Sequence, residues 1–202
     1  KEVANIASGK ASTAMSKLFK EQSAIGINIE DVNIKYISDM SDAKTFKAGD
    51  RALGIRTLIK NDLEGAIYLL IPSKEIGNLL GSLSGVEKPK YEIEEMDDLS
   101  QKAVSALTEV GNIIISHYCA GISDFLKIKL VHEVPQLALE DYAALVDSEI
   151  VNYSRDAESL IFLETSIVTK GNTINAAILL LPKPEYVHNF MNLMNVDSIV
   201  SI

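Results

Sequence analysis

The sequence is short of cysteine and of long apolar runs, and each shortage excludes a class of protein. Cys119 is the only cysteine among 202 residues, which rules out a disulfide framework and favours a reducing compartment. It lies in an apolar helical stretch without a basic neighbour, so a buried, inert thiol is expected. No apolar run approaches the roughly 20 residues that cross a bilayer, and no basic-then-apolar leader opens the chain. The sequence therefore predicts a cytoplasmic protein without membrane insertion.

Positive charge is also scarce. Lys and Arg together number 19 against 28 Asp and Glu, and the net charge of -9 disfavours binding to phosphate backbones. No glycine-rich phosphate loop follows a strand, and His132 and His188 have no Cys, His or carboxylate at ligand spacing. We therefore expect no nucleic-acid partner, no metal site and no cofactor bound by this chain. With 47% hydrophobic residues, the chain can bury a sizeable core.

A five-residue pattern occurs twice, as Glu2-Val3-Ala4-Asn5-Ile6 and as Glu109-Val110-Gly111-Asn112-Ile113. A glutamate and an asparagine three residues apart share one face of a helix, so each copy places a carboxylate beside an amide. Near the end of each half an apolar run closes on a proline, Pro72 or Pro182, and a helix pattern follows. Duplication is the simplest account, and duplicated halves usually pack about a pseudo-two-fold axis.

The periodicity of apolar residues predicts the elements of each half. Strands are expected near 25–37, 52–59, 64–71, 127–134, 159–169 and 173–181, and helices near 1–19, 74–83, 98–126, 142–153 and from 185. A change of phase at Glu30-Asp31 indicates a bulge, and Lys60-Asn61-Asp62 indicates a hairpin turn. Asp98 followed by Gln101 resembles a capping box at the start of the central helix.

The expected fold class is α/β (α+β), with an antiparallel sheet and two long surface helices on one side. We expect a single domain over residues 1–202 that consists of two repeats. The first half is 1–84, the second half is 97–202, and the charged, glycine-containing and proline-containing stretch 85–96 connects them.

The central helix carries a polar stripe of Ser105, Glu109, Asn112 and Ser116, which faces away from the core. Every amphipathic helix has such a stripe, so a solvated surface is the alternative for an isolated Glu-x-x-Asn. Gly111 and Asn112 are poor helix formers, each costing up to about 1 kcal/mol relative to alanine. A functional site accounts for both residues, whereas close helix packing at Gly111 accounts for that one alone.

The pattern Ser105-x3-Glu109-x2-Asn112-x22-Pro135 resembles the signature of the CheC family of chemotaxis phosphatases, which also includes CheX and the phosphatase part of FliY. Further segments look like CheC segments in the same order: Ser123-Asp124-Phe125-Leu126, Val134-Pro135-Gln136-Leu137, Phe162-Leu163-Glu164-Thr165 and Leu181-Pro182-Lys183-Pro184. Two copies of the motif in one chain fit CheC better than CheX, which carries one. The resemblance covers nearly the whole chain and implies a pseudo-two-fold, duplicated CheC-like domain.

The resemblance implies a hydrolase that removes the phosphoryl group from the phosphoaspartate of the response regulator CheY. The implied catalytic residues are Glu2, Asn5, Glu109 and Asn112, with Ser105 and Pro135 in support. In each pair the asparagine would orient the attacking water and the glutamate would dock against the receiver domain. Mg²⁺ is expected in the receiver-domain substrate and not in this chain. CheD, the receptor-modifying deamidase, is implied as a second partner.

Several alternatives stay open. The position that matches Pro135 in the first half is Asn28, so either both sites work or the first is weaker, and two working sites are favoured. The alternative function is a non-catalytic adaptor that binds CheD or a receiver domain, and a structural role in the flagellar switch is a third. His117, one turn beyond Asn112, is expected to be a partly buried structural histidine.

Overall fold

The structure is a computed structural model of the chain. It describes residues 27–36, 45–47, 49–83, 86, 89, 91–153, 159–169 and 172–193. The expected first helix, with Glu2 and Asn5, lies outside the described residues. None of the helices within the described ranges is long and apolar enough to cross a membrane.

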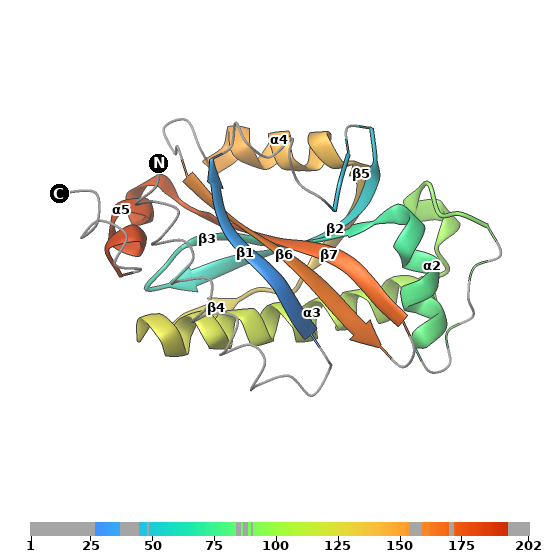
Figure 1. Ribbon diagram of the computed structural model, residues 1–202, viewed down its shortest axis with the longest axis horizontal. Coiled ribbons are helices and arrows are strands. Elements are labelled where there is room, and N and C mark those ends of the chain that lie inside the picture. Colours follow the sequence, from blue (N-terminus) through green and yellow to red (C-terminus); the bar gives the residue numbers. More distant parts are fainter. Residues whose placement is uncertain are drawn as a thin grey trace.

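The described residues form one seven-stranded sheet in which every neighbouring pair of strands is antiparallel (Figure 1). Its strands are β1 (Ile27–Tyr36), β2 (Arg51–Asn61), β3 (Gly65–Pro72), β4 (Leu130–His132), β5 (Gln136–Asp141), β6 (Ser159–Thr169) and β7 (Asn172–Pro182). The order across the sheet is β1-β6-β7-β3-β2-β4, and β5 also pairs with β2. The expected hairpin between β2 and β3 is confirmed, and so is the bulge in β1, where the register shifts between Asn28 and Asp31.

The strand order has an internal two-fold symmetry. The hairpins β2–β3 and β6–β7 meet at the centre of the sheet, where β3 pairs with β7. Strand β1 adds to β6 of the second hairpin, whereas β4 and β5 add to β2 of the first. When Pro72 is matched with Pro182, Leu69 matches Leu179 and Tyr68 matches Ile178. Leu69 pairs with Ile178 and Tyr68 pairs with Leu179, so the match converts each of these two pairs into the other. A duplicated chain would produce this arrangement, and the division of the chain into two repeats stays a prediction.

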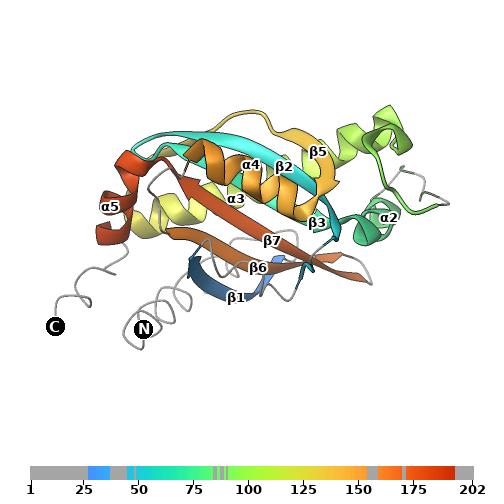
Figure 2. The same ribbon diagram turned by 90° about the horizontal axis from the view of Figure 1, so that it is seen from above.

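Helices cover both faces of the sheet (Figures 1 and 2). The long helix α3 (Gln101–Leu126) and helix α2 (Ser73–Ser82) share a core with one face, and α5 (Pro184–Leu193) adds Phe190 to it. Helix α4 (Tyr142–Tyr153) packs on the opposite face. The expected fold class is confirmed, and α3 is one of the two long helices expected on one side. The other falls among the residues outside the description.

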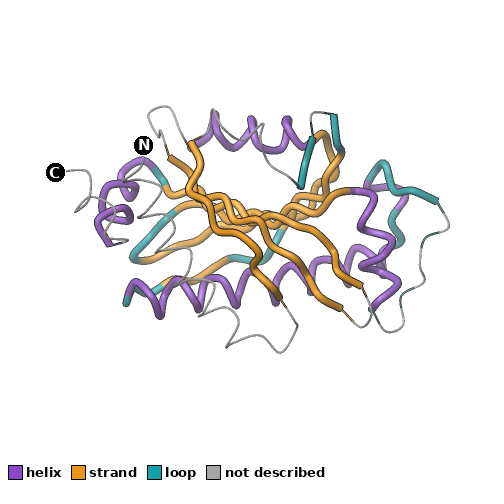
Figure 3. Tube along the Cα trace, in the orientation of Figure 1, coloured by secondary structure: helices purple, strands orange, loops and turns teal. Residues whose placement is uncertain are grey.

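Strand β3 shows why the sheet is buried on both faces. Every residue from Gly65 to Pro72 is buried, and the sequence GAIYLLIP is almost continuously apolar. Because neighbouring side chains in a strand point to opposite faces, Ile67 and Leu69 join the core beneath α3, whereas Tyr68 and Leu70 join the core beneath α4. The strands therefore lie as a middle layer between helices, as the tube in Figure 3 shows.

Two expectations about the centre of the chain are wrong in detail. The strand expected over 127–134 is the shorter strand β4, strand β5 was not expected, and Pro135 lies between the two. Both pair with β2, and a proline, which has no N–H to donate, interrupts the pairing.

The start of α3 also differs from the expected Asp98–Gln101 capping box. Ser100 is the N-cap, and its side chain accepts a hydrogen bond from Ala103 N at 3.2 Å. Asp98 belongs to the preceding 3₁₀ helix η2 (Met96–Asp98), where its carboxylate accepts from the backbone N–H groups of Glu94 and Glu95. These two hydrogen bonds, that from Glu95 first, lower the pKa of Asp98.

Candidate active site on the central helix

Helix α3 is capped at its start and packs one face against the sheet. It begins at the Ser100 cap and ends at Lys127, which adopts a left-handed conformation with φ 56°. Its inner face buries Leu107, Ile114 and Tyr118 against the sheet, each at most 1% exposed. Polar residues on such a helix occupy fixed positions, because the backbone beneath them is part of the core.

The outer face presents the side chains of the expected signature. Ser105 and Glu109 are exposed, and Asn112 is half-buried. Glu109 and Asn112 lie on neighbouring turns of the same face because they are three residues apart. Within the described ranges, no hydrogen bond or ion pair joins the side chain of Glu109 or of Asn112 to another protein group. Both groups are therefore available to an external partner.

Gly111 brings α3 into close contact with the sheet. A Cβ atom at this position would lie 2.5 Å from Ile55 Cγ2 and 3.0 Å from Ile55 Cδ1. Ile55 is fully buried in β2, so it has little room to move. Helix packing thus explains the glycine, and the neighbouring Asn112 is the residue that packing does not explain.

A second group of polar residues ties α3 to the segment after β4. Ser116 Oγ donates to the backbone oxygen of Asn112 at 2.6 Å and lies 2.8 Å from His132 Nε2. On the other side of the imidazole, Nδ1 lies 2.9 Å from the backbone oxygen of Glu133. Both Ser116 and His132 are half-buried. The turn that bears Asn112 is therefore linked to the chain just before Pro135.

Glu133 is anchored in turn to strand β2. Its N–H donates to Leu58 O at 2.9 Å, and its carbonyl accepts from Thr57 Oγ1 at 2.7 Å. Thr57 is only 2% exposed, so this hydrogen bond is sheltered from water. The Glu133 carboxylate forms an ion pair with Lys60. Pro135, which lies two residues after the anchored Glu133, is buried.

The structure thus brings together part of the expected site. Ser105, Glu109 and Asn112 share the outer face of α3, and Pro135 lies in the segment that is tied to the helix one turn beyond Asn112. Sequence reasoning missed His132, which it considered only as a metal ligand. The available signal was Ser116 in the polar stripe, whose partner lies 16 residues away.

Two other residues behave as expected. Cys119 is 4% exposed, and burial raises the pKa of its thiol to about 12, so the thiolate is absent near neutral pH. His117 is half-buried, and its Nδ1 lies 2.7 Å from Ile113 O, which makes it a structural residue of the helix. In the described part of the chain, no cluster of three or more His, Cys, Asp or Glu side chains has the arrangement of a metal site.

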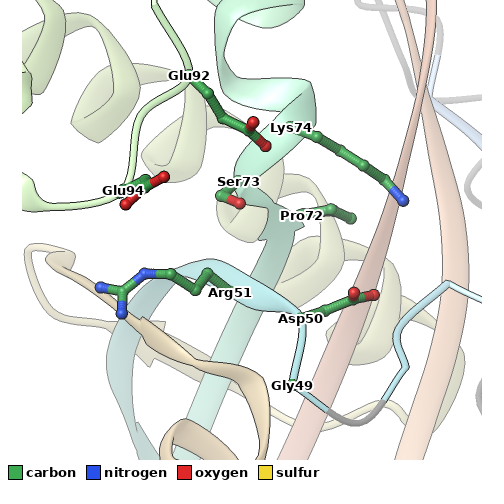
Figure 4. Close-up of a pocket in the computed structure, with 8 residues that line it drawn as sticks. All are labelled: Gly49, Asp50, Arg51, Pro72, Ser73, Lys74, Glu92 and Glu94. Atoms are coloured by element: carbon green, nitrogen blue, oxygen red, sulfur yellow. The ribbon is translucent and has the colours of Figure 1, made fainter.

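A pocket of about 330 Å³ lies elsewhere, at the start of α2 (Figure 4). Its lining is Gly49, Asp50, Arg51, Pro72, Ser73, Lys74, Glu92 and Glu94. Arg51 Nη2 already donates to Leu139 O at 3.1 Å, and the Asp50 carboxylate accepts from Lys47 N at 2.8 Å. The charges are mixed, and Arg51 and Lys74 extend in opposite directions in the figure. None of the signature residues lines this pocket, so it does not belong to the candidate site.

Comparisons with known proteins agree with the geometry. The model of the CheC-like family matches residues 103–138, the span from just before Ser105 to just after Pro135. The CheY-P phosphatase CheC of Bacillus subtilis (strain 168) is 26% identical over 185 residues, which cover 90% of this chain and 85% of that protein.

Solved structures extend the comparison to the fold. FliY of Thermotoga maritima has a TM-score of 0.56 and 19% identity, with 96% of this chain and 92% of that chain covered. The FliM middle domain from H. pylori has a TM-score of 0.52 and 11% identity, with 97% and 94% covered. At these identities the two structures establish the shared fold and nothing finer.

Proposed function

We propose that this chain, which is similar to the CheC-like family over residues 103–138 and to Bacillus subtilis CheC over 90% of its length, hydrolyses the phosphoaspartate of phosphorylated CheY. The observation that carries the proposal is that Glu109 and Asn112 lie together on the outer face of α3 and have no hydrogen-bond or ion-pair partner among the described residues. The name of the Bacillus subtilis relative supports the choice of substrate.

The chemistry of an aspartyl phosphate needs little from a second protein. The phosphorylated aspartate is an acyl phosphate, which is already activated for hydrolysis. The receiver domain contributes its own Mg²⁺ and lysine to balance the charge on the phosphoryl oxygens. The missing part is a water held in line with phosphorus. An asparagine amide orients a water without depending on a protonation state, as a glutamine does in small GTPases. Asn112 is the group that we assign to this role.

Glu109 has a different role in this scheme. Its carboxylate is exposed one turn before Asn112 and has no partner among the described residues. An unpaired anion at the edge of the contact suits the cationic lysine of a receiver domain. We assign Glu109 to docking, which fixes the register in which the amide of Asn112 meets the phosphoryl group. Ser105 and Pro135 support this arrangement at the two ends of the signature.

The test is the rate at which phosphorylated CheY loses phosphate, measured in Mg²⁺ buffer against its spontaneous decay. We expect the native chain to accelerate the loss. Asn112→Ala should lower kcat about a hundredfold for the site it belongs to, the usual effect of losing one well-placed donor. Glu109→Gln should raise KM more than it lowers kcat, because it weakens docking. Asn189→Ala on the exposed side of α5 is the matched control and should have the native rate.

The second motif copy makes the double variant informative. Glu2 and Asn5 lie outside the described residues, and we propose that they form an equivalent site. If so, Asn112→Ala and Asn5→Ala each leave part of the activity, and only the double variant loses it. Equal rates for all four proteins would refute the assignment of the asparagines. Binding of phosphorylated CheY without faster decay would instead favour an adaptor.

CheD is the second partner that we propose, on the resemblance to CheC alone. Co-elution of the chain with CheD in size-exclusion chromatography tests it. Separate elution at micromolar concentrations of both proteins would contradict this part of the proposal.

A further inference from the structure

The contacts around His132 form an unbroken chain between two parts of the signature. They run from the Asn112 carbonyl through Ser116 and the imidazole to the Glu133 carbonyl, with heavy-atom distances of 2.6, 2.8 and 2.9 Å. The Glu133 carbonyl is also held by Thr57 of β2. The helix turn of Asn112 and the segment of Pro135 are thus connected by side chains as well as by the chain.

Chemistry assigns the donors and acceptors in this chain of contacts. The two carbonyl oxygens at its ends can only accept, so Nδ1 of His132 donates to Glu133. The roles of Ser116 Oγ and Nε2 in their contact depend on the tautomer of the ring, so the link is defined here by the three heavy-atom contacts.

The position of these contacts gives them a consequence for the site. A serine that bonds to the carbonyl four residues before it tends to bend the helix locally. Here the carbonyl belongs to Asn112, and the serine is held from outside by His132. The backbone of Asn112 sets the direction in which its side chain extends. A displacement of about 1 Å in a group that aims a reactant can cost a hundredfold in rate.

We propose that His132 is a positioning residue, which acts through Ser116 to fix the turn of Asn112 relative to the Pro135 segment. In this role the imidazole contacts neither the water nor the phosphoryl group. The kinetic consequence rests on the function proposed above, whereas the mechanical link between His132 and Asn112 does not. The two can therefore be tested separately.

The kinetic test is made in the Asn5→Ala background, in which only the Asn112 site acts, and compares two variants that break the link with one that does not. His132→Phe removes the ring nitrogens and Ser116→Ala removes the hydroxyl, and each should lower the kcat of this background about tenfold. KM should stay within about twofold, because Glu109 and the docking surface are unchanged. Ser116→Thr keeps the hydroxyl and should keep the kcat of the Asn5→Ala background. His188→Phe makes the same substitution on the exposed side of α5 and should leave both constants unchanged.

The spectroscopic test does not need activity. In nitrogen-15 NMR spectra, Nδ1 of His132 should carry a proton, because it donates to the Glu133 oxygen. Ser116→Ala should shift the backbone and side-chain amide signals of Asn112, whereas His188→Phe should not. If His132→Phe does not fold, as judged by circular dichroism, Ser116→Ala carries both tests.

The outcomes separate the two proposals. If the native chain is active, a kcat that Ser116→Ala leaves unchanged in the Asn5→Ala background overturns the positioning role, and so do Asn112 signals that do not respond to Ser116→Ala. A native chain that fails to accelerate the decay of phosphorylated CheY, but shows the expected Asn112 shifts, overturns the proposed function and leaves the positioning of this turn established.

Discussion

Replacing Gly111 with alanine should destabilise the protein, although alanine is the better helix former. The new methyl carbon would lie 2.5 Å from Ile55 Cγ2, about 1 Å closer than carbon atoms approach in a packed core. Ile55 Cγ2 is attached directly to Cβ and Ile55 is 0% exposed, so relief requires that α3 move away from β2. Since Asn112 is the next residue, the same movement displaces the candidate site.

The net effect follows from two opposing terms. Overpacking a core usually costs about 1–3 kcal/mol, and replacing glycine by alanine inside a helix returns up to about 1 kcal/mol. We expect Gly111→Ala to lose about 1–2 kcal/mol of unfolding free energy, which lowers Tm by about 2–8 °C in a chain of this length. Thermal unfolding followed by circular dichroism measures this loss. Gly81→Ala on the exposed side of α2 is the control and should be neutral or slightly stabilising.

A double-mutant cycle identifies the atom responsible. Ile55→Ala removes both methyl contacts and by itself should cost about 2–5 kcal/mol. In the Gly111→Ala background the same change should cost at least about 0.5 kcal/mol less, because the clash disappears with the side chain. A Tm for Gly111→Ala at or above that of the native chain would refute the packing argument. It would also reopen a direct role for the glycine at the site.

Three further predictions concern groups with defined surroundings. Cys119, whose pKa burial raises to about 12, should not react with Ellman's reagent at pH 8 until the protein is unfolded in guanidinium chloride. The hydrogen bond and ion pair with Lys183, at 2.6 Å, lower the pKa of Glu64, so this pair stabilises the fold above the ordinary glutamate pKa. The Tm difference between the native chain and Glu64→Gln should therefore shrink as the pH falls through the lowered pKa, and a difference that persists at pH 2 would contradict this. Thr57→Val removes the buried hydrogen bond to Glu133 O and should cost about 1–1.5 kcal/mol in urea unfolding, whereas an unchanged midpoint would show that the bond contributes nothing.

Local patterns were sufficient to predict most of the fold. The strands of both hairpins follow from apolar runs that end at turns or at proline, and the bulge in β1 follows from a change of phase at Glu30-Asp31. The family resemblance is confirmed as well. The predictions of the hairpins and of the bulge were correct because each depends on residues that are close together in the sequence.

The features that sequence reasoning missed depend on distant residues. β4 and β5 both pair with the distant strand β2, whereas the local pattern led us to expect one strand over 127–134 and none after Pro135. Ser100 and Asp98 are both good caps, and only the structure shows that Asp98 serves the 3₁₀ helix instead of α3. His132 has no local signal, because its partner Ser116 comes from another element.

Asn112 combines a backbone held by neighbouring groups with a side chain that has no partner in the described part of the chain, as the proposed site requires. Its carbonyl is held by Ser116, the preceding Gly111 is pressed against Ile55, and its own amide has no partner in the described part of the chain. A surface asparagine with no function would need none of these constraints. A group that orients a water needs all of them, since the amide must keep its direction while its hydrogen-bonding capacity stays available to the reactants. The arrangement is the one that the proposed catalytic role of Asn112 requires.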